Sequence, residues 1–78
     1  MDYTLQSVLF KKSKFSVKEA KSYLKKKGYK VTFYGKQYDE TANFYRFRQA
    51  KPKKNVKYFI KTSESGVVMV FYYQSKKL

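Results

Sequence analysis

The sequence contains no cysteine, no histidine and no tryptophan, and it has only five acidic residues. Without cysteine there is no disulfide and no thiolate metal site, and without histidine the commonest general base and metal ligand is missing. The one adjacent acidic pair, Asp39 and Glu40, points to opposite sides of an extended backbone and makes a poor catalytic dyad. These absences predict a protein that is not an enzyme and that holds no metal or other cofactor.

Long hydrophobic runs are missing as well. No segment approaches the roughly 18 to 20 apolar residues that span a bilayer, and the first residues lack the basic-then-apolar layout of a secretory signal. With the absence of cysteine, this predicts an intracellular protein without membrane insertion. The sequence shows no internal repeat and no low-complexity linker, so residues 1–78 predict a single domain with a small core.

Positive charge is what the chain has in excess. Nineteen lysines and arginines against five acidic residues give a formal net charge of +14. A field of this size attracts nucleic acid, anionic lipid or an acidic protein. AT-rich coding would raise the lysine content without any functional demand, but it would also raise glutamate and aspartate, which are scarce here. The charge excess therefore indicates a polyanionic partner.

Arg46 and Arg48 are the only arginines, and they lie in the aromatic segment 43–49. Strict alternation predicts a strand there, with Tyr45 and Phe47 on one face and the arginines beside an aromatic ring on the other. Arginine stacks on rings and grips phosphate through a planar fork, which lysine cannot do. The alternative is that both guanidinium groups are merely solvated on an exposed sheet face.

One helix is predicted over residues 16–27. Ser16 and Glu19 form a capping box at its start, and Gly28 supplies the left-handed residue that ends it. Its narrow apolar stripe consists of Val17, Ala20, Tyr23 and Leu24. The lysines at 25–27 suit the helix dipole, which is an alternative to a role in binding.

The remaining segments read as strands. Residues 3–10 and 67–73 are apolar on both faces, which indicates strands that lie inside a sheet or are covered by a partner. Further strands are predicted over residues 31–36, 43–49 and 56–62, with a polar loop at 37–42 and a hairpin turn at 63–66. The pattern predicts an α+β fold, in which one helix packs on a mostly antiparallel sheet of about five strands. The order is β-α-β-β-β-β, and the last three strands are expected to form a meander.

A single helix covers one face of such a sheet, so the other face is expected to be open. If Tyr58 and Ile60 point to the helix with Phe47, the open face carries rings among cations. Such a face is typical of platforms for single-stranded nucleic acid, where bases stack on rings and phosphates meet lysine and arginine. The expected phosphate-binding residues are Arg46, Arg48, Lys57 and Lys61, and the expected stacking residues are Phe44, Phe59 and Tyr34. The same face is alternatively the centre of a homodimer or of another protein interface.

A succession of short motifs also resembles a known pattern. The motifs are Leu5-Gln6-Ser7-Val8-Leu9, Lys14-Phe15-Ser16 with Glu19-Ala20, Gly28-Tyr29-Lys30, Tyr45-Arg46-Phe47-Arg48-Gln49, Pro52 and Gly66-Val67. They cover nearly the whole chain and resemble a small module found in large DNA viruses of protists, with a similar pattern in some tailed-phage proteins. The resemblance implies a viral origin and a compact β-α-β fold, but no particular reaction. Such modules often carry tryptophan in the helix, where this chain has Tyr23.

Charge, strand pattern and resemblance together predict a nonenzymatic viral protein that binds DNA or RNA. Binding is expected to be largely electrostatic and weakly sequence-specific. The expected location is the host cell cytoplasm or nucleus, or the virion. The alternative is a virion or host-directed protein-interaction module, which could dimerise through the same sheet face.

Overall fold

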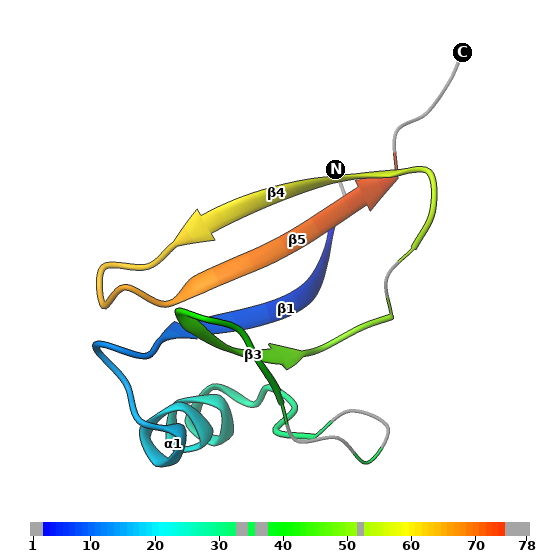
Figure 1. Cartoon of the computed structure of the whole chain (residues 1–78). Helices are drawn as coiled ribbons and strands as arrows, with labels where there is room; N and C mark the ends of the chain where they lie inside the picture. The colour runs from blue at the N-terminus through cyan, green and yellow to red at the C-terminus, as the bar shows by residue number, and fades with distance from the viewer. Residues whose placement is uncertain (1–2, 33–34, 36–37, 52, 75–78) are drawn as a thin grey trace.

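Alternating aromatic and aliphatic residues form the strands of this protein, and the capped segment after the first strand forms its helix. The computed structural model describes residues 3–32, 35, 38–51 and 53–74. Within these residues the elements are β1 (Thr4–Lys11), α1 (Val17–Lys27), β2 (Asp39–Glu40), β3 (Phe44–Arg48), β4 (Val56–Thr62) and β5 (Val68–Gln74). One helix on a five-stranded antiparallel sheet confirms the predicted α+β fold and its order of elements (Figure 1).

The centre of the sheet is β1. The described strands lie in the order β2-β3-β1-β5-β4, and every neighbouring pair is antiparallel. The inner positions of β1 and β5 confirm the prediction made from their apolar residues on both faces. The predicted meander of the last three strands is wrong, because β3 and β4 lie on opposite sides of the β1–β5 pair. Its second half is confirmed, since a tight turn with Gly66 at φ +89° joins β4 and β5.

Hydrogen bonds to β1 explain why the chain does not turn straight back after β3. The backbone N–H groups of Gln49 and Ala50 donate to the carbonyl of Gln6 at 2.7 and 3.2 Å, and the Gln6 amide donates to the Ala50 carbonyl at 3.1 Å. The Gln49 side chain also bonds the N–H and the carbonyl of Lys30, at 2.7 and 2.8 Å. The end of β3 is therefore held against β1, and the chain reaches the far side of the sheet before β4 begins (Figure 1).

The second strand differs from its prediction over residues 31–36. Val31 and Thr32 are not in a strand, and residues 33, 34, 36 and 37 lie outside the described part of the chain. The strand is instead β2, inside the expected loop at 37–42, where Asp39 opposes Arg46 and Glu40 opposes Tyr45. Pairing with β3 determines where β2 forms, and the alternation of neighbouring residues does not predict that pairing.

The termini of α1 match the prediction in detail. The Ser16 hydroxyl accepts from the Glu19 N–H at 3.2 Å, and the Ser16 N–H donates to the Glu19 carboxylate at 2.9 Å. At the other end Gly28 has φ +78°, and the N–H of Tyr29 donates to the Leu24 carbonyl at 2.8 Å, which closes a Schellman motif. Among the described residues there is no helix with the length and apolar character needed to cross a membrane.

The core lies between α1 and the β1–β3 half of the sheet. Its fully buried side chains are Val8, Phe10, Ala20, Leu24, Phe47 and Val67. The Phe10 ring makes edge contacts with Phe15, Tyr23 and Phe47 at centroid distances of 5.3, 5.5 and 5.6 Å. In Figure 1 the helix lies on the side of β1 and β3, away from β4 and β5. The helix therefore covers half of one sheet face.

Gly28 provides a test of the helix end. A Cβ at this position would meet no atom within 4 Å, so the cost of Gly28→Ala is conformational. We expect Gly28→Ala to lower the free energy of unfolding by about 1 kcal/mol, because L-residues disfavour positive φ. Gly28→Asn should cost less, since asparagine tolerates the left-handed region. Equal losses in the two variants, measured by urea denaturation, would contradict this account.

Glu19 provides a pH-dependent test of the helix start. The hydrogen bond from the Ser16 backbone N–H, together with the Ser16 hydroxyl, lowers the pKa of Glu19 in the folded protein. A lowered folded-state pKa adds stability above the unfolded-state pKa of about 4.3, and this stability is lost as the pH falls through the folded-state pKa. Glu19→Gln should therefore flatten the fall in unfolding free energy on acidification. Glu64→Gln is the charge-matched control, and an equal flattening in the control would argue against the capping box as its cause.

Candidate nucleic-acid interface

The strand register shows which side chains share a face with the arginines. Directly opposed residues of antiparallel strands lie on the same face of the sheet. Arg48 of β3 opposes Ser7 of β1, and Ser7 opposes Val70 of β5. Val70 in turn opposes Ile60 of β4. By alternation this face, which we call the Arg face, also carries Phe44, Arg46 and Tyr58.

The opposite face carries the helix over part of its area. Phe47 opposes Val8, and both side chains are completely buried in the core with α1. Val8 opposes Met69 of β5, and Met69 opposes Lys61 of β4. Lys61 and its alternating neighbours, Lys57 and Phe59, therefore lie on the helix face.

The predicted platform is thus divided between two faces, and its predicted composition is wrong. The structure places Phe44, Arg46 and Arg48 together, but Lys57, Phe59 and Lys61 lie on the other side of the sheet. Tyr58 and Ile60 were expected to point to the helix, yet they lie on the Arg face with 47% and 65% of their surface exposed. Because α1 covers β1 and β3, it offers no core to β4. The predicted stacking residue Tyr34 lies outside the described residues.

Four aromatic rings gather on the part of the helix face that α1 leaves uncovered. Phe59 stacks on Phe71 with the centroids 5.3 Å apart and the planes inclined by 15°. The Tyr3 ring lies 5.3 Å from Phe59 and 5.0 Å from Phe71, and the Tyr73 ring lies 5.9 Å from Phe59. Tyr3 is 48% exposed. These contacts join Tyr3, which precedes β1, to the rings of β5 and β4 in one aromatic cluster.

Two exposed lysines accompany these rings. The Lys61 Nζ lies 5.5 Å from the centroid of the Tyr3 ring, within the range of a cation–π contact. Lys57 opposes Tyr73 in the β4–β5 register. The strands β4 and β5 contain no aspartate and no glutamate, so neither strand supplies an acidic side chain that offsets this charge. We call these six residues the ring platform: Tyr3, Lys57, Phe59, Lys61, Phe71 and Tyr73.

The arginines of β3 lie in a different electrostatic setting. The Arg48 Nε donates to the Asp39 carboxylate at 2.8 Å, with both side chains about one third exposed, at 37% and 31%. Asp39 directly opposes Arg46 in the register, but its carboxylate bonds Arg48 instead. The Arg46 Nε is buried and makes no hydrogen bond within the described residues. Arg48 is thus partly neutralised, whereas Arg46 forms no ion pair with another described residue.

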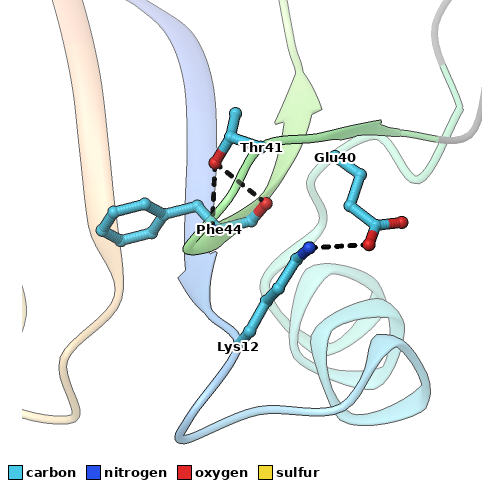
Figure 2. Close-up of polar contacts among 4 residues, drawn as sticks. All are labelled: Lys12, Glu40, Thr41 and Phe44. Carbon is cyan, nitrogen blue, oxygen red and sulfur yellow. Dashed lines mark hydrogen bonds and ion pairs between the residues drawn. The ribbon is translucent and has the colours of Figure 1, made fainter.

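Phe44 begins β3 at a tight turn on the β2 side of the sheet. The Thr41 hydroxyl accepts from the Phe44 N–H at 3.0 Å and donates to its carbonyl at 3.3 Å (Figure 2). Nearby, Lys12 pairs with Glu40 at 2.6 Å and fastens the loop after β1 to β2. Figure 2 shows the Phe44 ring pointing away from this ion pair. The turn therefore positions Phe44 on the Arg face, across the sheet from the ring platform.

Metal binding has little support in the described part of the chain. No three acidic side chains gather there, and both Asp39 and Glu40 are already engaged in ion pairs.

Sequence reasoning missed three members of the ring platform, which are Tyr3, Phe71 and Tyr73. The alternation of residues 67–73 already sets Phe71 and Tyr73 on one side of their strand. Aligning that strand with β4 through the turn at 63–66 could have joined them to Phe59, because a short hairpin turn determines the register.

Comparisons of the chain with protein-family models, with characterised proteins and with solved structures find no match. The viral relationship inferred from the sequence motifs therefore stays a prediction.

The face assignment can be tested with neighbouring residues of β4. Ile60→Thr should change the free energy of unfolding by less than about 0.5 kcal/mol, because the side chain is largely exposed. Phe59→Thr should cost about 1 to 3 kcal/mol, since it removes contacts with three rings. Threonine suits a strand at both positions. Thermal denaturation that ranked the two losses in the reverse order would overturn the assignment.

Proposed function

We propose that this protein binds single-stranded nucleic acid through the ring platform, without catalysis and with little sequence specificity. The observation that carries the proposal is the cluster of four rings, in which Phe59 contacts each of the other three, beside Lys57 and Lys61 on the half of the helix face that α1 leaves uncovered. The motif resemblance adds the proposal that this activity serves a large DNA virus, in the host cell or in the virion.

The chemistry of the platform suits a nucleic-acid strand. Every base presents a π face, so aromatic rings bind bases with little regard to sequence. Exposed lysines beside the rings can meet the phosphates between successive bases. The net charge of +14 draws a polyanion to the protein and contributes a salt-dependent part of the affinity. An unpaired strand fits better than a duplex, because bases inside a duplex do not present their faces.

The arginines are not part of this proposed surface. Arg46 and Arg48 lie on the other side of the sheet from Phe59, so the platform does not bring them to the same short stretch of strand. Arg48 is also paired with Asp39. They contribute to the general positive field, and the apolar surroundings of Arg46 favour a second, protein-binding function.

Salt dependence and single substitutions test the proposal. We expect Lys57→Ala and Lys61→Ala each to weaken binding to oligo-dT and to flatten the log–log salt slope by about 0.7, the value per phosphate contact on single strands. Phe59→Leu should cost about 1 to 3 kcal/mol of binding free energy and leave the slope nearly unchanged, because stacking is lost and charge is not. Fluorescence anisotropy over a range of salt concentrations measures both quantities.

Lys18→Ala on the helix and Arg48→Ala on the Arg face are the controls, because each also removes one positive charge. If either of them matched Lys61→Ala in affinity and slope, binding would be a diffuse charge effect and the platform would be refuted. Thermal denaturation of Phe59→Leu verifies that a loss of affinity does not come from unfolding.

A further inference from the structure

A shallow groove crosses the Arg face of the sheet. It is lined by Gln6, Ser7, Leu9, Arg46, Tyr58 and Val70, and its volume is about 310 Å³. These residues come from β3, β1, β5 and β4, so the groove runs across the strands. We call it the Arg groove. No helix or strand of the described residues covers this side of the sheet. Their only helix, α1, packs on the opposite face.

The rim of the Arg groove is apolar. Ile60 opposes Val70 and is 65% exposed, and Tyr58 is 47% exposed. On the other side of Val70, Leu9 is half-buried between Arg46 and Val68 in the register. Tyr58 is the one ring in this described lining, and the aliphatic side chains beside it bury partner side chains well but do not stack on bases as rings do. This surface therefore suits a protein partner better than a nucleic-acid strand.

Arg46 places a single positive charge in this apolar setting. Its local acidic neighbour, Asp39, bonds Arg48, and Arg46 has no ion-pair partner within the described residues. Its Nε is shielded from water without a hydrogen bond. A carboxylate is the group that stabilises a guanidinium in such surroundings most strongly, because the two can form a pair of parallel hydrogen bonds.

We propose that the Arg groove binds an acidic peptide segment of a partner protein. A carboxylate of that segment pairs with Arg46, and a neighbouring apolar side chain packs on Ile60 and Val70. A second copy of this chain is disfavoured as the occupant, because each copy carries a net charge of +14. The Arg groove and the ring platform lie on opposite faces, so both can be occupied at once and this proposal does not depend on nucleic-acid binding.

Three labelled peptides of equal length test the proposal. The first alternates glutamate and leucine, the second has serine in place of leucine, and the third has lysine in place of glutamate. We expect the first to bind, the second to bind much more weakly, and the third not to bind, as measured by fluorescence anisotropy. Binding of the first peptide should shift the side-chain methyl signals of Leu9, Ile60 and Val70 in NMR spectra, and not the ring signals of Phe59 and Phe71.

Substitutions identify the residues responsible. Arg46→Gln should weaken binding of the glutamate–leucine peptide at least about tenfold, because charge-assisted hydrogen bonds are lost. Arg46→Lys should also weaken binding, since lysine lacks the planar fork. Ile60→Ser removes the apolar contact at an exposed position that the fold does not need, and it should weaken binding as well. Lys61→Gln, which removes one charge from the other face, should have little effect.

Several results would overturn the proposal. Equal binding of the serine-containing peptide would show that charge alone attracts the peptide. A loss in Lys61→Gln as large as in Arg46→Gln, or displacement of the peptide by oligo-dT, would place the peptide on the ring platform. Concentration-dependent shifts on the Arg face without peptide would identify a second copy as the occupant. Failure of oligo-dT to bind would refute the proposed nucleic-acid binding, but it would not contradict peptide binding in the Arg groove.

Discussion

Val8 and Phe10 of β1 are buried between α1 and the sheet, and the rest of the structure depends on this contact. The same strand pairs with β3 on one edge and with β5 on the other, so its register determines the faces of both neighbours. Through β5 it also determines the faces of β4. A shift of this register by one residue would exchange the contents of the two faces, and both proposed sites would be lost.

The short helix has consequences for the far half of the sheet. With eleven residues, α1 covers β1 and β3 and leaves β4 and β5 without a helix against them. The rings of Tyr3, Phe59, Phe71 and Tyr73 cover one another instead. The ring platform therefore stabilises the hairpin, while Phe59, Phe71 and Tyr73 stay partly exposed and Tyr3 is 48% exposed. A substitution there is expected to affect both stability and the proposed binding, so variants that keep most of the side-chain volume are the informative ones.

The few acidic residues explain how charge is distributed over the surface. Glu19 caps the helix, Glu40 pairs with Lys12, and Asp39 pairs with Arg48. Acidic groups thus fasten the helix start and the β2–β3 corner. The lysines of β4 and the guanidinium of Arg46 have no such local acid in the described ion pairs. The two proposed sites consequently differ in chemistry, since one lysine pair lies beside a cluster of rings and Arg46 lies in a groove lined by Leu9, Val70 and the single ring of Tyr58 among the described residues.

The sequence by itself determined the features that depend on neighbouring residues. The capping box, the Gly28 helix end and the β4–β5 turn follow from short-range hydrogen bonds and backbone preferences, and all are found as predicted. The apolar character of β1 and β5 was enough to place them inside the sheet. Strand alternation in residues 43–49 and 56–62, with the net charge of +14, was enough to suggest a surface that combines rings with cations.

Only the tertiary structure decided which of these residues act together. Alternation in β4 separates Tyr58 and Ile60 from Lys57, Phe59 and Lys61. Alternation alone does not say which of these two groups faces the helix side of the sheet. Pairing with β5 and the limited reach of α1 decide this, and both are contacts between distant parts of the chain. The position of β2 is decided in the same way, by pairing with β3. Local pattern specifies which residues share a side of a strand, and long-range packing specifies what that side faces.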